Sequence, residues 1–269
     1  MERWRNRMKY QLEKTFDLVK TCGEIIKNAD RSSINIQEKS GPANFVTSYD
    51  LLVQNTLKEG LTRLYPDARF IGEEGEQEDF HEKGEFFIVD PIDGTTNFIK
   101  DYHMSCISVA HIMNGEVDFA MIHNPYLNEL FWAVKGEGAY CNAKRIHVSE
   151  QPLSNGIVLF GTSPYDADLA KQSFDMAYSY FTKALDIRRS GSAALDLCAI
   201  AAGRAELYFE MILSPWDYAA GMLLVEEAGG IVTTSDGEKP ALNKRSSILA
   251  RNHVHISGLE YEEISGRKV

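Results

Sequence analysis

The chain of 269 residues lacks features that mark several classes of protein. Its four cysteines, at positions 22, 106, 141 and 198, form no C-x-x-C pair, which argues against a disulfide framework and a zinc ribbon. No apolar run approaches the length of about eighteen residues that a membrane span needs, and no apolar leader follows the N-terminus. We therefore expect a cytoplasmic protein with reduced cysteines and no membrane partner.

The sequence also has fewer basic than acidic residues. Lys and Arg number 28 against 39 Asp and Glu, which leaves a formal net charge of −11. An excess of carboxylates repels phosphate backbones and anionic lipids, so the sequence predicts no nucleic-acid partner. A cluster of carboxylates can instead form a binding site for cations. Hydrophobic residues at 44% and charged residues at 25% are otherwise typical of a globular protein.

Apolar residues at helical spacing predict two long helices early in the chain, one ending near Asn28 and one running from Thr47 or Ser48 to Pro66. A short strand is expected at 34–38, followed by a Gly41-Pro42 turn. Short apolar runs at 69–71 and 86–89 predict buried strands, and strands predominate to about residue 141.

Beyond residue 150 the pattern alternates between strand and helix. Strands are expected at 157–160, 184–188 and 205–209, and helices at 167–180, 193–202 and 217–228. This alternation predicts an α/β (α+β) protein of layered elements with short connections. We place a soft boundary near residue 150, which separates a region 1–150 that carries most candidate ligands from a region 151–269 that closes a shared cleft.

One segment contains several residues that could bind a metal ion and an anion. The apolar residues 86–89 lead into Asp90-Pro91-Ile92-Asp93-Gly94-Thr95, so a buried strand is expected to end at Asp90 while Asp93 returns a second carboxylate to the same point. Two such oxygen ligands suit a hard divalent cation, and burial of an unpaired carboxylate is costly. Gly94 lets backbone N–H groups approach an anion, and a helix starting near Thr95 would add its dipole. The segment predicts a metal site next to an anion site.

Competing motifs do not fit this spacing. An EF-hand loop that began at Asp90 would need an oxygen ligand at Ile92 and a glycine at Thr95. A haloacid-dehalogenase-type nucleophile has the pattern D-x-D, whereas two residues separate Asp90 and Asp93, so this mechanism is kept as a distant alternative. No Walker sequence and no complete dinucleotide loop is present.

Further carboxylates stand at two other places. Asp217 opens an apolar helix, where helix capping alone would also account for an aspartate. The small residues 219–221 that follow would let another element approach closely. Glu73 and Glu74 directly follow the apolar residues 70–72, whereas the acidic residues from Glu76 onward are typical of a solvated loop.

Three segments resemble the signature motifs of the inositol monophosphatase family: Gly72-Glu73-Glu74, Asp90-Pro91-Ile92-Asp93-Gly94-Thr95-Thr96-Asn97-Phe98 and Trp216-Asp217-Tyr218-Ala219-Ala220-Gly221. Their order and separations fit from about residue 39 to about residue 252. The resemblance implies a layered αβαβα sandwich of the inositol monophosphatase and fructose-1,6-bisphosphatase type, usually a homodimer. It also implies a lithium-sensitive phosphatase that hydrolyses small phosphomonoesters with two or three Mg²⁺ ions.

The resemblance assigns roles position by position. Glu73, Asp90 and the carbonyl of Ile92 resemble the ligands of a first metal, and Asp90, Asp93 and Asp217 those of a second, while a third ion also uses Glu73. Gly94 and Thr95 match positions whose N–H groups hold the phosphate, and the Thr95 hydroxyl with Glu73 would orient the attacking water. Lys39 and Asp50 match a basic and an acidic position near the site.

The substrate side is less constrained by the sequence. In the family, positions such as Ala193 and Glu210 face a polyol ring, and residues 161–163 resemble a wall in which Thr162 supplies a hydroxyl. Arg188 and Arg189 could instead bind a second phosphate, because planar arginine suits bidentate contacts, or one could be exposed and the other paired.

Hydrolysis of a phosphomonoester requires charge neutralisation, an in-line water and a stabilised leaving group, which two cations can supply without a phosphoenzyme. The resemblance of the three motifs, together with Glu210, leads us to expect a phosphatase whose first substrate is inositol 1-phosphate. Fructose-1,6-bisphosphatase, 3′,5′-bisphosphate nucleotidase and histidinol phosphatase are alternatives on the same scaffold. A non-catalytic binding protein is a distant one.

Overall fold

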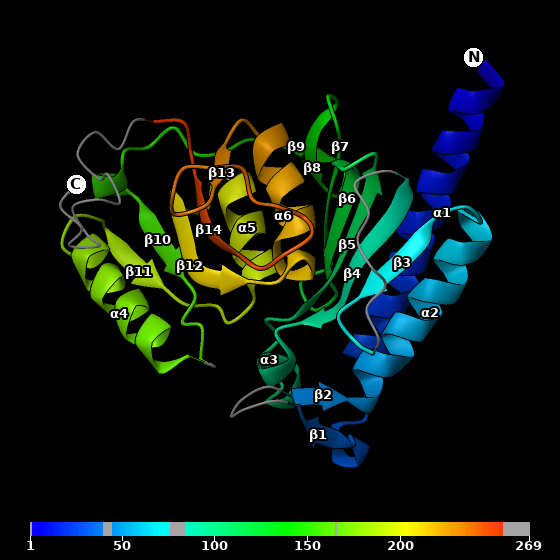
Figure 1. The fold of residues 1–269 in the computed structure, drawn as a ribbon, viewed down its shortest axis with the longest axis horizontal. Helices are drawn as coiled ribbons and strands as arrows, with labels where there is room; N and C mark the ends of the chain where they lie inside the picture. Colours follow the sequence, from blue (N-terminus) through cyan, green and yellow to red (C-terminus); the bar gives the residue numbers. More distant parts are fainter. Residues whose placement is uncertain (1, 40–44, 76–83, 165, 255–269) are drawn as a thin grey trace.

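The computed structural model describes residues 2–39, 45–75, 84–164 and 166–254 (Figure 1). The expected Gly41-Pro42 turn and the acidic residues from Glu76 to Lys83 lie outside these ranges. Within them, no helix has the combination of length and apolar character that a membrane span needs.

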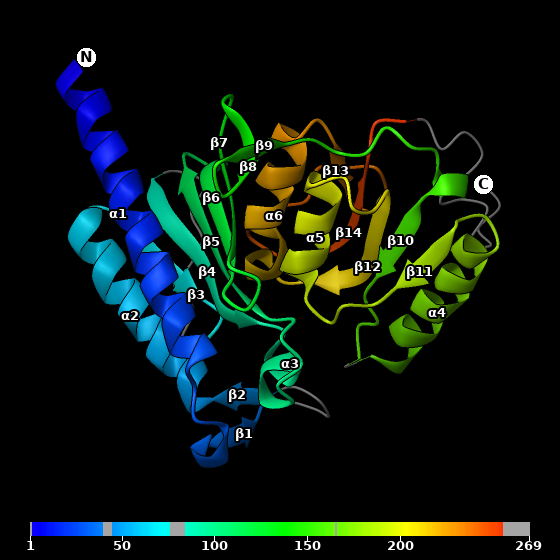
Figure 2. The same ribbon diagram turned by 180° about the vertical axis from the view of Figure 1, so that it is seen from behind.

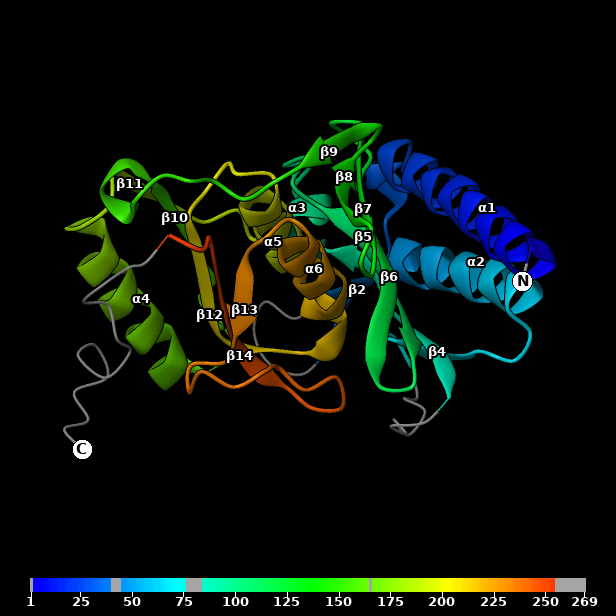
Figure 3. The ribbon, with the colours of Figure 1, turned by 90° about the horizontal axis from the view of Figure 1, so that it is seen from above.

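Five layers make up the molecule, and Figures 1 and 2 show them side by side. Helices α1 (Glu2–Lys27) and α2 (Ser48–Leu64) cover one face of a seven-stranded sheet. Helices α5 (Ala193–Ala201) and α6 (Pro215–Glu227) fill the space between this sheet and a five-stranded sheet, whose far face carries α4 (Ala167–Phe181) (Figure 3). The expected αβαβα sandwich is confirmed.

The larger sheet has the order β3-β4-β5-β6-β7-β8-β9, parallel between β3 and β4 and antiparallel elsewhere. Its strands are β3 (Arg69–Gly72), β4 (Glu85–Asp93), β5 (Cys106–Met113), β6 (Glu116–Asn124), β7 (Glu129–Val134), β8 (Gly138–Cys141) and β9 (Lys144–Ile146). A hairpin of β1 (Ile36–Glu38) and β2 (Phe45–Thr47) lies beside the short helix α3 (Thr95–Ile99).

The smaller sheet has the order β11-β10-β12-β14-β13. Its strands are β10 (Ile157–Phe160), β11 (Asp186–Arg188), β12 (Leu207–Leu213), β13 (Ile231–Thr233) and β14 (Ser246–Arg251). β12 runs four residues past its expected end at 209, because its pairing with β14 continues through an irregularity between Glu210 and Leu213. The extension places Glu210 inside a strand.

The largest apolar core lies around α5 and α6, between the two sheets. Helix α6 is buried on nearly every side, as expected for a helix enclosed by other layers. The small residues expected to permit a close approach do so: a Cβ on Gly221 would lie 2.4 Å from Leu197 Cδ1 of α5. Because this core joins elements from both sides of residue 150, the two sheets are held as one packed unit.

Candidate active site

A bulge in β4 brings two aspartates together. The strand does not end at Asp90 as expected but continues to Asp93, and its register with β5 shifts between the pairs Asp90–Ser108 and Asp93–Cys106. In a regular strand, residues three apart point to opposite faces of the sheet. One extra residue cancels this alternation, and Pro91, which has no N–H for the ladder, lies within it. Asp90 and Asp93 can therefore serve one site.

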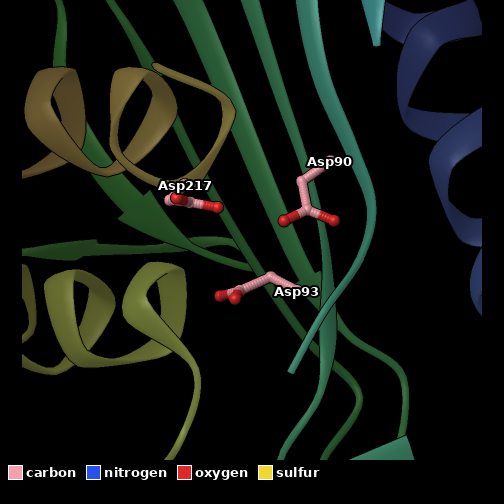
Figure 4. Close-up of side chains that lie close together, drawn as sticks. All are labelled: Asp90, Asp93 and Asp217. Carbon is pink, nitrogen blue, oxygen red and sulfur yellow. The ribbon is translucent and has the colours of Figure 1, made fainter. Parts of the chain in front are cut away.

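Asp217 completes a group of three carboxylates (Figure 4). Each of Asp90, Asp93 and Asp217 offers an oxygen, and the three oxygens lie within 4.8 Å of one another. Burial, together with neighbouring carboxylates, raises the pKa of all three, to about 6 for Asp93. In the described chain, no lysine or arginine forms an ion pair with any of them. Convergent carboxylates, two buried and one half-buried, without a cationic partner fit a hard divalent cation.

Asp93 is held rigidly by the start of α5. Its Oδ2 accepts hydrogen bonds from Ser192 Oγ at 2.6 Å and from Ala194 N at 2.7 Å. Both donors belong to the first turn or cap of α5, whose unpaired N–H groups favour a carboxylate. These bonds counteract the effect of burial on the pKa of Asp93, and both of them use the same oxygen.

Asp217 is a helix cap as well as a candidate ligand. Its Oδ2 accepts from the N–H of Ser214 at 2.7 Å and forms a capping box at the start of α6, with Pro215 in the first turn. The capping interpretation of Asp217 and the ligand interpretation are therefore both compatible with its position.

Glu73 stands next to this group and not inside it. Its Oε1 lies 2.9 Å from Lys39 Nζ, and Lys39 also forms an ion pair with the buried Glu74. Burial by itself would lower the pKa of Lys39, but the two glutamates outweigh it and raise the pKa. The structure thus places Lys39 next to the site as the partner of Glu73.

Asp50 and Thr95 form a second polar group in which Ile92 takes part. Asp50 is fully buried in the first turn of α2, and its Oδ2 accepts from Thr47 N at 2.8 Å. Burial raises the pKa of Asp50 to about 7, although the Thr47 bonds counteract it. The Thr95 hydroxyl lies 3.1 Å from the carbonyl oxygen of Ile92 and 3.5 Å from Asp50 Oδ1.

The carboxylates open into a cavity of about 270 Å³. Gly94 turns the chain from β4 into α3 with φ 84°, and a Cβ there would lie 2.8 Å from Met104 O, so only glycine fits. The Asn97 side chain fixes this turn against the facing loop by donating to Met104 O at 2.7 Å and Ser190 O at 3.0 Å. A short helix thus begins at Thr95, as the sequence predicts.

Glu210 forms the opposite wall. Its Oε2 accepts from the Tyr208 hydroxyl at 2.8 Å and its Oε1 from Ser163 N at 3.2 Å. Burial raises the pKa of Glu210. Ser163 adopts φ 42°, a left-handed conformation that is costly for serine, and Gly161 has no side chain that would collide with the Glu210 carboxylate. Ala193 also lines the cavity.

Of the two arginines considered for a second phosphate, Arg189 and not Arg188 lies at the cavity. Arg188 is exposed and forms an ion pair with Asp186 next to it in β11, so it does not line the cavity. Arg189 lines the cavity instead and donates to Thr162 Oγ1 at 3.2 Å. Successive side chains of a strand point to opposite faces, and β11 ends at Arg188, so only the structure separates the two. Thr162 itself is buried and is not among the residues that line the cavity.

Two charged residues of the cavity escaped sequence analysis. Asp196 lies buried in the first turn of α5, and its pKa is raised well above the usual value by burial and then by Glu210 and Asp93, although Ser190 counteracts this. Arg245 precedes β14 and donates from Nε to Ser214 Oγ at 3.3 Å. In the sequence, Asp196 has the pattern of an ordinary acidic residue in the first turn of a helix, and Arg245 that of a surface loop residue. No sequence signal therefore distinguishes either of them from residues outside the site.

The chain is a two-sheet αβαβα sandwich in which three carboxylates converge between the layers, and such oxygen ligands suit a divalent cation. The family model described as the inositol monophosphatase family matches residues 8–264. The chain therefore belongs to the inositol monophosphatase family.

Individual relatives carry different names. A Nus factor SuhB from Xylella fastidiosa is 40% identical over 195 residues, which cover 72% of this chain and 70% of the relative. A fructose-1,6-bisphosphatase/inositol-1-monophosphatase from Thermotoga maritima is 34% identical over 231 residues, 86% of this chain and 84% of the relative. The structure of the extragenic suppressor protein suhB from Bartonella henselae matches with a TM-score of 0.86 at 30% identity, covering 96% of this chain and 99% of that one.

Proposed function

We propose that this protein is a Mg²⁺-dependent phosphatase of small phosphomonoesters, with inositol 1-phosphate as its first expected substrate. The observation that carries the proposal is the group of carboxylates in the wall of a cavity, formed by the buried Asp90 and Asp93 and the half-buried Asp217. With Glu73 and the carbonyl of Ile92 next to them, these residues would hold two or three ions. The bound ions would neutralise the phosphate oxygens and lower the pKa of the attacking water.

The chain's own residues would then orient the reactants. The Thr95 hydroxyl has Ile92 O and Asp50 Oδ1 within reach as acceptors, which leaves its oxygen lone pairs free to accept a hydrogen bond from water. Glu73 would accept the second hydrogen of that water. Two fixed acceptors would aim the oxygen at phosphorus, and such positioning supplies a large part of catalysis.

The N–H groups of Gly94 and Thr95 would hold the phosphate, because the first turn of α3 leaves donors without helical partners. The water oxygen bonds to phosphorus as the bond from phosphorus to the ester oxygen breaks; one proton of the water passes to the leaving oxygen and the other stays on the phosphate. No enzyme side chain becomes phosphorylated in this scheme. Glu210, held by Tyr208 and Ser163, would accept hydrogen bonds from substrate hydroxyls.

Bisphosphates are the alternative substrates that the cavity favours most. Arg189 lines the cavity, and the Thermotoga maritima relative is named for two activities. A guanidinium beside the site would suit the second phosphate of fructose 1,6-bisphosphate or adenosine 3′,5′-bisphosphate. Histidinol phosphate, which has no second phosphate, would make no use of it.

Phosphate release with Mg²⁺ tests the proposal. We would compare kcat/KM for inositol 1-phosphate, fructose 1,6-bisphosphate, adenosine 3′,5′-bisphosphate, histidinol phosphate and NADP⁺, with EDTA as the control. Inositol 1-phosphate should be preferred. Preference for a bisphosphate would replace the first substrate, whereas the absence of metal-dependent release from every compound would contradict the phosphatase proposal.

A protein-binding role is the second candidate, and the name Nus factor of the SuhB relatives raises it. A specific surface favours it here: four large apolar side chains follow one side of α4 and the turn after it. They are 50–71% exposed and consist of Phe174, Tyr178, Phe181 and Leu185. Spacings of four and three residues place Phe174, Tyr178 and Phe181 on one side of α4, Leu185 follows in the turn after the helix, and such patches commonly mark interaction sites.

Mutations can distinguish the phosphatase function from the protein-binding function. In a bacterium whose own SuhB has been deleted, this chain would be supplied either as Asp93→Asn or as Tyr178→Ser with Phe174→Ser. If binding is the function, the Asp93→Asn chain should restore growth and the α4 variant should not. The opposite pattern would leave phosphatase activity as the function.

A further inference from the structure

Gln54 makes an unusual contact with the chain that carries Glu73. It lies in α2, is 8% exposed, and both ends of its amide bond to the backbone of Glu74. Gln54 Nε2 donates to Glu74 O at 2.7 Å, and Glu74 N donates to Gln54 Oε1 at 3.0 Å. The side chain therefore takes the place that a neighbouring strand would occupy just beyond the end of β3.

Gly72 is what allows this contact. A Cβ at Gly72 would lie 2.2 Å from Gln54 Oε1 and 2.6 Å from its Cδ. Such distances cannot occur, so any larger residue would displace the amide from Glu74. The glycine of the Gly72-Glu73-Glu74 segment thus serves the close approach of α2 to the end of β3.

Glu73 is fixed between two backbone anchors. On one side its own N–H donates to Val89 O at 3.1 Å, and Val89 directly precedes Asp90 in β4. On the other side the amide of Gln54 holds both polar backbone groups of Glu74. After Glu74 the chain turns at Gly75 with φ 89°. Without the Gln54 anchor, nothing described on that side would tie Glu73 to α2.

We propose that Gln54 is a positioning residue for the metal centre, acting through Glu73. By clamping the Glu74 peptide it sets the distance and direction of the Glu73 carboxylate relative to Asp90. A purely apolar side chain of the same size would fill the space but leave the Glu74 N–H and C=O without these partners. The inference rests on the proposed function, because it requires that the carboxylates bind a divalent cation.

Metal binding measured directly tests the inference. The change is Gln54→Met, which keeps length and volume but removes the amide. Titration calorimetry with Mg²⁺ and Mn²⁺ should show affinity weakened about 10- to 100-fold, the usual effect of losing a group that orients a ligand. Turnover at saturating metal should fall much less than affinity.

Gln11 supplies a matched control. Its amide Nε2 donates to Leu64 O at 2.6 Å and joins α1 to the end of α2, away from the site. Gln11→Met removes the same kind of bond and should cost stability without changing metal affinity. Gly72→Ala is the second variant, since its Cβ should displace Gln54 and weaken metal binding to a similar extent. The double variant should then be no worse than either single change.

Three outcomes are decisive. If the unmodified protein binds neither ion, the proposed function fails, whatever the variants do. If it binds them while Gln54→Met and Gly72→Ala, checked as folded by circular dichroism, bind within twofold of it, the positioning role is wrong. If both variants lose metal affinity and Gln11→Met does not, the role is supported.

Discussion

Asp93 illustrates how one residue can serve both the fold and the chemistry. One of its oxygens is committed to Ser192 and Ala194, and its carboxylate lies in a group of like charges that burial makes costly. Without a cation, these charges repel one another. A bound divalent cation would neutralise this repulsion by attracting the same carboxylates. The site should therefore lower the stability of the folded protein without metal and raise it when the cation is bound.

A prediction follows for Asp93→Asn and Asp217→Asn. Each change removes one charge from the group, so the melting temperature without metal should stay the same or rise. Turnover should fall about 10³-fold, because charge stabilisation in the transition state is lost. The gain in melting temperature on adding Mg²⁺ should shrink as well.

Thermal melts with and without Mg²⁺, together with kcat, would check both aspartates. Asp67→Asn, at an exposed position before β3, is the control that should change neither quantity. Turnover close to that of the unmodified protein in either site variant would overturn the assignment of the carboxylates as metal ligands.

The neighbouring arginines allow a matched test of substrate choice. Arg189→Gln should lower kcat/KM for fructose 1,6-bisphosphate about 10- to 100-fold, the equivalent of one lost charge-assisted contact, and leave inositol 1-phosphate nearly unchanged. Arg188→Gln, on the exposed side of the strand, should affect neither. An equal loss for both substrates would show that Arg189 shapes the loop and does not select the substrate.

At the scale of elements, β4, β5 and β6 are tied together by a buried histidine. His111 Nε2 lies 3.0 Å from Glu85 Oε1 and its Nδ1 3.3 Å from Asp118 Oδ2. Its ring stacks on Phe119, with centroids 4.6 Å apart, and is next to Tyr65 and Phe87. Burial would lower the pKa of His111, but the two carboxylates outweigh it and raise the pKa.

The direction of that shift predicts a pH dependence of stability. A raised pKa in the folded state means that the contribution of His111 is complete below its unfolded pKa, about 6.5, and is lost as pH rises through the folded pKa. His111→Gln should therefore cost about 1.5–3 kcal/mol at pH 6 and less at pH 9. Urea denaturation at both values would measure it, with the exposed His147→Gln as control. A difference that does not change with pH would contradict the charged pair.

At the scale of the whole molecule, the two sheets share α5 and α6. The largest core includes Ile88 and Phe131 of the first sheet together with Leu224 of α6 and Tyr208 of the second sheet. A cut at residue 150 would remove α6 from the face of the first sheet, exposing a broad apolar surface. The boundary that the sequence suggests is thus a change of pattern along the chain, and whether it separates domains stays a prediction.

Expression of the two halves as separate fragments would test whether residue 150 separates two domains. Residues 1–150 and 151–269 expressed separately should each aggregate or melt without a cooperative transition, whereas co-expression should restore a soluble pair. A cooperative thermal transition from residues 1–150 alone would show two independent domains. Light scattering on the intact chain would at the same time test the homodimer, which stays a prediction.

Much of this protein could be predicted from its sequence because the relevant physics is local. Helix α2 ends just before Pro66, because proline cannot continue it. The apolar run before Asp90 predicts a buried strand, and Gly94 before Thr95 predicts the turn into a helix. The motifs around Glu73, Asp90 and Asp217 also predict the layered fold by family resemblance.

Other features were decided only by tertiary structure, because they depend on which residues meet across the fold. The bulge that aligns Asp90 with Asp93 exists through pairing with β5, and the choice of Arg189 over Arg188 depends on where β11 ends. Asp196 and Arg245 reach the cavity from elements far from the motifs. Spacing along a chain determines local conformation, whereas contacts between distant segments are set by packing between layers.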